Sequence, residues 1–180
     1  MSRPYHAVNV LVGTKQAKIL EDGRSCGLLI QKAKRPLLVL GSRILLEVVG
    51  EKPILEYALA FSTATDTPIC ATAHTKKKLL EAGCAPACSW DLVEITNSLK
   101  QKSWNGVRGE GNHDLVLFMG IRSDLLESCL STLKHFAPHL KTVAIDRVYF
   151  PNADYSTPNF QRDEKLRTFL EECLESLKTK

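Results

Sequence analysis

The sequence contains 180 residues, of which 44% are hydrophobic, 24% charged and 7% aromatic, and its formal net charge is +4. A chain of this length buries about 70% of its extended surface on folding, and the composition excludes a disordered protein. The length leaves no room for a cofactor domain together with a second, catalytic domain. We therefore expect residues 1–180 to form a single domain.

Hydropathy and charge also limit the partners. No apolar run reaches the roughly 20 residues of a membrane span, and Met1–His6 show no secretory signal. We therefore expect a cytoplasmic protein without a membrane partner. The small net charge does not indicate a nucleic-acid interface, so no nucleic acid is expected either. The densest basic cluster, Lys76–Lys78, is typical of a solvated helix face, and an acidic partner is the alternative.

The cysteines give little sign of a metal site. Cys70, Cys129 and Cys173 fall in apolar patterns and are expected to be small core residues. Cys84 and Cys88 enclose Ala-Pro-Ala and resemble a site. Two thiolates without a second pair nearby cannot complete a tetrahedral zinc site or hold an iron–sulfur cluster, so we predict no metal.

The first part of the chain predicts a helix, a strand and a broken helix. Apolar residues recur at helical spacing over Lys15–Lys34. Arg35–Gly41 is a continuous apolar run closed by glycine, which is typical of a strand buried on both faces. A second helical pattern covers Ile44–Phe61, where Gly50 and Pro53 predict two pieces or a bend.

The middle of the chain predicts one strand, two helices and a loop. Thr67–Thr72 is a short strand. Helical patterns follow over Thr75–Ala82 and Asp91–Lys102, and Asp91 is a plausible N-cap. Lys102–His113 holds three glycines among polar residues and is predicted to be a long loop.

The last part alternates again between strand and helix. Asp114–Gly120 and Lys141–Asp146 are predicted strands, separated by an amphipathic helix over Asp124–Phe136. Tyr149–Phe160 is rich in proline and asparagine and is predicted to be irregular. Arg162–Lys178 is a helix with one apolar stripe. The stripe consists of Leu166, Phe169, Leu170, Cys173, Leu174 and Leu177.

This alternation predicts an α/β fold, a three-layer α/β/α open parallel sheet of Rossmann-like type. Ligands bind such sheets beyond the carboxyl ends of the strands. The residues there are the candidate cofactor-binding residues. They are Gly41, Ser42, Arg43, Thr72, His74, Gly120, Arg122 and Asp146.

In two of these loops, glycine is followed two residues later by arginine. Gly41 and Gly120 would let the backbone approach an anion, and Arg43 and Arg122 would hold a phosphate. Ordinary turns with solvated arginines have the same pattern, and neither a dinucleotide fingerprint nor a Walker A loop follows any strand. His74 is the best-placed titratable group, although a lone loop histidine is often a surface or capping residue. Because catalytic motifs are missing, we predict no catalytic residues.

Four segments resemble the central domain of thiamine-diphosphate enzymes, which belongs with the sirtuin-like, or DHS-like, NAD/FAD-binding folds. The segments are Ala33–Gly41, Thr67–Thr72, Asp114–Gly120 and Val143–Asp146. The chain lacks the Gly-Asp-Gly segment that holds thiamine diphosphate. It therefore resembles that domain alone.

Over nearly its whole length the chain resembles the epsilon subunit of the archaeal acetyl-CoA decarbonylase/synthase complex. The resemblance covers Ala33–Gly41, Ala71–His74 with the lysines that follow, Asp114–Gly120 and Asp146–Asn159. The last segment, which ends in Pro-Asn, is the more specific one.

The resemblance implies a subunit of a complex that makes or cleaves acetyl-CoA. Its partner would be the carbon monoxide dehydrogenase alpha subunit, in an assembly of two alpha and two epsilon subunits, and the isolated chain would be a homo-dimer or larger. Alpha holds the nickel–iron–sulfur centre, whereas epsilon carries no metal and stabilises the assembly or helps electrons to reach FAD. As interface patches we predict the helix from Arg162 and the aromatic residues of the preceding loop. These are Tyr149, Phe150, Tyr155 and Phe160, which could instead pin the loop to its own core.

Three hypotheses follow. In the first, the chain is a non-catalytic structural subunit. In the second, it is an electron-transfer module that holds the FAD diphosphate at residues 41–43 and 120–124, with Asp146 near a ribose hydroxyl. In the third, it is a stand-alone FAD- or NAD-binding enzyme of the sirtuin type, for which the glycine-rich entry loop with its catalytic histidine is missing.

Overall fold

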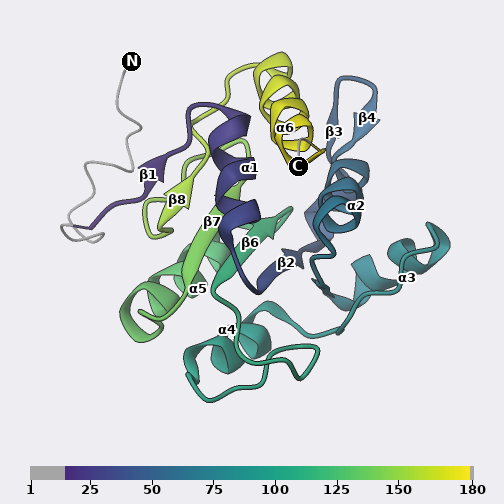
Figure 1. The fold of residues 1–180 in the computed structure, drawn as a ribbon. Coiled ribbons are helices and arrows are strands. Elements are labelled where there is room, and N and C mark those ends of the chain that lie inside the picture. The colour runs from purple at the N-terminus through teal and green to yellow at the C-terminus, as the bar shows by residue number, and fades with distance from the viewer. Residues whose placement is uncertain (1–14, 179–180) are drawn as a thin grey trace.

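A computed structural model describes residues 15–178 and shows a parallel sheet between two layers of helices (Figure 1). Met1–His6 lie outside the described residues. The strand order is β1-β8-β7-β6-β2-β5, and every neighbouring pair is parallel. The strands are β1 Lys18–Ile19, β2 Pro36–Leu40, β5 Ile69–Ala71, β6 Leu115–Met119, β7 Lys141–Ile145 and β8 Tyr155–Ser156. The predicted α/β fold is confirmed.

Six α-helices and a 3-10 helix, η3, accompany this sheet within residues 15–178. Their bounds are α1 Gly23–Lys32, η3 Ser42–Leu45, α2 Ile54–Thr65, α3 Ala73–Glu81, α4 Leu92–Lys100, α5 Ser123–Phe136 and α6 Asp163–Lys178. A small antiparallel hairpin, β3 Val48–Val49 and β4 Lys52–Pro53, lies between η3 and α2. None of the helices in the described part of the chain is long and apolar enough to cross a membrane.

Side chains that alternate along β2 show why this strand is apolar throughout. Leu38 and Leu40 belong to the core cluster formed with α1, α2 and α6. Leu37 and Val39 belong to the other cluster, formed with α4 and α5. Because successive side chains of a strand point to opposite faces, a sheet covered on both sides needs apolar residues at every position.

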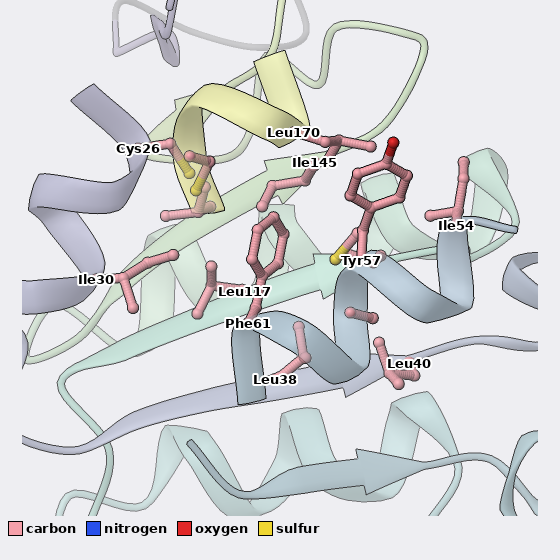
Figure 2. Close-up of a cluster of buried hydrophobic side chains, with 14 of the residues drawn as sticks. Cys26, Ile30, Leu38, Leu40, Ile54, Tyr57, Phe61, Leu117, Ile145 and Leu170 are labelled. Atoms are coloured by element: carbon pink, nitrogen blue, oxygen red, sulfur yellow. The ribbon is translucent and has the colours of Figure 1, made fainter. Parts of the chain in front are cut away.

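The first core cluster joins three helices that are distant in sequence. In Figure 2, Ile30 of α1, Tyr57 and Phe61 of α2 and Leu170 of α6 gather over Leu117 of β6. The predicted apolar stripe of α6 is buried along its whole length, which confirms it.

Helices α1 and α6 approach unusually closely at two glycines. A Cβ atom on Gly23 would lie 1.9 Å from the carbonyl oxygen of Phe169, and one on Gly27 would lie 1.7 Å from Oγ of Ser176. Only glycine allows two helix backbones to come so near to each other without a shift.

The predicted helix over Lys15–Lys34 begins later than expected. Lys18 and Ile19 pair with β8 as an outer strand, and the helix begins at Gly23. The carboxylate of Asp22 fixes this start, because its Oδ1 accepts a hydrogen bond from the N–H of Ser25 at 2.7 Å. The predicted N-cap Asp91 of α4 is confirmed in the same way, by a 2.8 Å bond from the N–H of Glu94.

The helical pattern over Ile44–Phe61 is wrong in its first half. The chain forms η3 and then the β3–β4 hairpin, and α2 begins only after Pro53. Gly50 lies in the hairpin turn with φ of +66°, a backbone conformation that favours glycine. The glycine and the proline therefore mark a hairpin and a helix start, rather than a bend within one helix.

The aromatic interface patch is wrong for two of its members. Tyr149 and Phe150 are each only 2% exposed. The hydroxyl of Tyr149 donates a hydrogen bond to the carbonyl of Ala17 at 2.9 Å. Tyr155 and Phe160 are half-buried, so the alternative, in which the aromatic side chains pin this loop to its own core, describes the segment. This segment also contains β8, which the sequence pattern did not predict.

Candidate functional site at the carboxyl end of the sheet

The candidate residues follow four strands that lie side by side, in the order β5, β2, β6 and β7. The structure brings two of the loops into contact. The N–H of Gly41 donates to the carbonyl of Met119 at 3.0 Å, and the N–H of Arg43 donates to the carbonyl of Gly120 at 2.9 Å. The guanidinium of Arg43 also lies 3.5 Å from Oγ of Ser123. The loops after β2 and β6 are therefore in direct contact.

Both glycines are needed for this contact between the loops. A Cβ atom on Gly41 would lie 2.4 Å from the carbonyl oxygen of Gly120. One on Gly120 would lie 2.4 Å from the backbone nitrogen of Ile44 in η3, and Gly120 also has a φ of +62°. The two glycines thus allow two segments of this chain to approach each other, and not only a backbone to approach an anion.

A small cavity lies at this end of the sheet, beside the ends of β6 and β7. A cavity of about 10 Å³ remains, lined by residues that include Glu47, Met119, Gly120, Asp146 and Arg147. Such a volume holds about one water molecule, whereas ligand pockets are usually about 300–1,000 Å³. A flavin diphosphate therefore does not fit into this cavity.

The two arginines have carboxylate partners. Nη2 of Arg43 lies 2.9 Å from Oε1 of Glu47, one turn further along the chain. Arg122 is paired with Asp124, and this hydrogen bond lowers the pKa of the Asp124 carboxyl. Both side chains of the second pair are largely exposed, so a solvent-exposed anion can reach Arg122 but must compete with Asp124.

Asp146 is a buried carboxylate at the end of β7. Its Oδ1 accepts a hydrogen bond from the N–H of Arg147 at 2.6 Å and a longer one from the N–H of Val148 at 3.3 Å. Burial raises the pKa of Asp146 to about 6, and the negative charge of Glu47 contributes to the shift. The carboxylate therefore stabilises the turn after β7 through these hydrogen bonds.

Thr72 and His74 lie at the start of α3, after β5. The N–H of Thr72 donates to the carbonyl of Leu40 at 3.2 Å, which ties this loop to β2. The hydroxyl of Thr72 is 3.2 Å from that of Thr75. His74 is exposed on the first turn of the helix. The structure thus places His74 on the outer surface and not among the residues that line the small cavity.

Sequence reasoning missed Glu47 and the hairpin that follows it. Arg147 holds this hairpin in place, because its Nη2 donates to the carbonyl of Val48 at 3.0 Å while its Nη1 pairs with Asp163 of α6. The signal in the sequence is Gly50-Glu-Lys-Pro53, which is typical of a turn as well as of a break in a helix.

Comparisons with known proteins agree with the resemblance. Residues 1–174 match the family described as CO dehydrogenase beta subunit/acetyl-CoA synthase epsilon subunit. The chain is 42% identical over 158 residues to the acetyl-CoA decarbonylase/synthase complex subunit epsilon of Methanothermobacter thermautotrophicus. The matched region covers 88% of this chain and 87% of that protein. It is 38% identical over 151 residues to subunit epsilon 1 of Archaeoglobus fulgidus, with 83% and 79% of the two chains covered. The chain therefore belongs to the family of CO dehydrogenase beta subunits and acetyl-CoA synthase epsilon subunits.

Proposed function

We propose that the chain is a non-catalytic epsilon subunit of an acetyl-CoA decarbonylase/synthase complex that binds and stabilises the carbon monoxide dehydrogenase alpha subunit. The observation that carries this proposal is the contact between η3 and Gly120, which fills the end of the sheet where related folds bind ligands. A protein whose ligand end is filled by its own backbone is better suited to holding a partner than to chemistry. The complex itself makes or cleaves acetyl-CoA.

The hairpin segment, residues 42–53, is the surface that we assign to the alpha subunit. Leu46 is 83% exposed and Val48 is 45% exposed. The segment is nevertheless fixed, because Arg43 pairs with Glu47 and Arg147 binds the backbone of Val48. Neighbouring large apolar side chains that are exposed on an ordered segment mark a candidate protein-binding surface. The stoichiometry of two alpha and two epsilon subunits is part of the same proposal.

The test is binding of the purified chain to the alpha subunit. We expect Leu46→Asp to weaken binding at least tenfold, because it places a charge in an interface that buries the leucine. The protection of alpha against heat inactivation should fall with it. Phe136→Asp is the matched control, since Phe136 is 68% exposed and ends α5 at the opposite end of the sheet. Equal binding by both variants would assign alpha to a different surface.

Electron transfer to FAD is the second candidate function. Its support is the meeting of the loops after β2 and β6 at the ligand-binding end of a parallel sheet, with Arg122 exposed beside them. Because the cavity beside Gly120 and Asp146 is only about 10 Å³, the flavin diphosphate would lie outside it, on Arg122.

This second function predicts that FAD binds the isolated chain. Flavin fluorescence should change with saturation in the range of tens of micromolar, and Arg122→Ala should weaken binding several-fold through loss of a phosphate partner. Arg24→Ala, an exposed change on α1, should have no effect. Fluorescence that stays constant over the same range would rule out flavin binding by the isolated chain and leave the structural function unaffected.

A further inference from the structure

Two cysteines that are distant in sequence meet at the outer strand β5. Cys70 lies on β5, and Cys88 lies in the loop after α3; the two form an isolated parallel bridge. The N–H of Ala71 donates to the carbonyl of Cys88 at 3.1 Å, and the N–H of Cys88 donates to the carbonyl of Ile69 at 3.4 Å. Backbone hydrogen bonds therefore hold the two cysteines at the spacing of neighbouring strands.

That spacing suits a disulfide. Neighbouring strands lie about 4.8 Å apart, and a disulfide requires a Cα–Cα distance of about 4.4–6.8 Å. Both side chains also pack on the same face, against the core cluster formed with α4 and α5. Cys84 packs against the cluster on the other face. The pair that the fold brings together is thus Cys70 and Cys88, and not the Cys84–Cys88 pair that the sequence spacing suggested.

The two thiols differ in exposure and in acidity. Cys70 is fully buried, and its thiol donates a hydrogen bond to the sulfur of Cys88. This bond lowers the pKa of Cys88, which is half-buried, while the same bond and burial raise the pKa of Cys70. No group of three or more potential metal ligands occurs among residues 15–178. We therefore consider the reaction of the two thiols with each other rather than metal binding.

We propose that Cys70 and Cys88 form a reversible disulfide by exchange with small-molecule disulfides, and that this bond fastens α3 to β5. The chain between the two cysteines contains all of α3, so the disulfide closes a loop around that helix. Helix α3 also contacts η3, which begins the hairpin segment. The inference does not depend on the proposed function.

The exchange has two balanced steps. The Cys88 thiolate attacks one sulfur of the small disulfide, whose S–S bond breaks, and the released thiolate takes up the proton that Cys88 has lost. A mixed disulfide remains on Cys88. The Cys70 sulfur then attacks the Cys88 sulfur and displaces the second small thiol, which leaves with the proton from Cys70. Two electrons pass from the protein dithiol to the small disulfide, which is reduced to two thiols.

The test uses the folded full-length chain with bis(2-hydroxyethyl) disulfide as the oxidant. We expect the number of titratable thiols to fall from six to four, with the loss of two hydrogen masses from the protein. Peptide mapping without reduction should find Cys70 linked to Cys88, and dithiothreitol should restore all six thiols. Tryptophan fluorescence offers a second readout, because disulfides quench indole emission. The backbone N–H of Trp90 donates a hydrogen bond to the sulfur of Cys70, and Trp90 packs against the same core cluster as both cysteines.

Three other cysteines serve as internal controls. Cys26 and Cys173 also share a hydrogen bond, but both are fully buried between α1 and α6, so they should stay reduced. Cys84→Ser should leave the reaction unchanged. Cys88→Ser should abolish it, and circular dichroism of that variant checks its fold.

Three results would overturn the inference. One is a mapped link between Cys84 and Cys88. Another is a folded wild-type chain that keeps six free thiols at a large excess of oxidant. The third is a disulfide that still forms at Cys70 in the Cys88→Ser variant.

Discussion

The variant Gly120→Ala is expected to lose about 2–5 kcal/mol of the free energy of unfolding. Two costs add at this position. Gly120 has a φ of +62°, in the left-handed region that costs an L-residue about 1–2 kcal/mol. The new Cβ atom would also lie 2.4 Å from the backbone nitrogen of Ile44, and overpacking of this kind costs about 1–3 kcal/mol. Because the nearest atoms belong to Ile44 and include its backbone, rotation of a distant side chain cannot relieve the contact.

Gly83→Ala separates the two costs. Gly83 has a similar φ of +75°, but a Cβ atom there would meet nothing within 4 Å. This variant should therefore show the backbone cost alone, about 1–2 kcal/mol. Urea unfolding of both variants, with midpoint and slope compared with the wild type, measures the difference. If both variants lose the same free energy of unfolding, the close contact between η3 and Gly120 adds no cost of its own. The inference that η3 packs tightly over this end of the sheet would then be wrong.

The central strands could be predicted from the sequence because their signal is local. β2 and β6 are runs of apolar residues, and β7 ends in three of them, Val143–Ile145. Burial on both faces leaves few alternatives for such runs. The outer strands β1 and β8 have only two residues each. Two residues are too few to show the alternation of apolar and polar side chains that marks a strand. Their pairing depends on contacts between residues 18–19 and 155–156, which no local pattern reveals.

The candidate site was only partly predictable. The topology alone places Gly41, Gly120 and Asp146 at one end of the sheet, and the structure agrees. What the glycines contact is a long-range property. A glycine after a strand is compatible with a bound phosphate and with a backbone neighbour, and only the position of Ile44 distinguishes the two. The pairing of Cys70 with Cys88 was hidden for the same reason, since Cys84 is the nearer cysteine in sequence.

In the proposed function, closure of this end of the sheet would let a nucleotide-binding type of fold act as a docking surface. The hairpin segment lies over the ends of the chain's own strands, and Leu46 of this segment is exposed to solvent. The contacts that remove the ligand space therefore create the surface that we assign to the partner. Variants such as Gly120→Ala should therefore lower both the stability of the hairpin segment and the affinity for the partner.

Asp146→Asn is expected to stabilise the protein at neutral pH by up to about 3 kcal/mol. Burial, followed by the charge of Glu47, raises the pKa of Asp146 from 3.8 to about 6 in the folded state. Below pH 4 both states hold the proton. Between pH 4 and pH 6 the unfolded chain releases the proton while the folded chain keeps it, so the folded state loses about 1.4 kcal/mol of stability for each pH unit. Above pH 6 the loss is constant.

Asparagine avoids this loss because it carries no charge, and its amide oxygen can still accept the hydrogen bonds from the N–H groups of Arg147 and Val148. The measurement is urea unfolding of wild type and variant at several pH values between 3.5 and 7. The two curves should agree near pH 3.5 and separate as pH rises through 6, with the variant the more stable. Asp124→Asn is the control: its pKa is lowered by Arg122 and it is exposed, so any change should be small and of opposite sign. Parallel curves for Asp146→Asn would mean that this carboxylate remains charged without penalty, and that its hydrogen bonds fully compensate for burial.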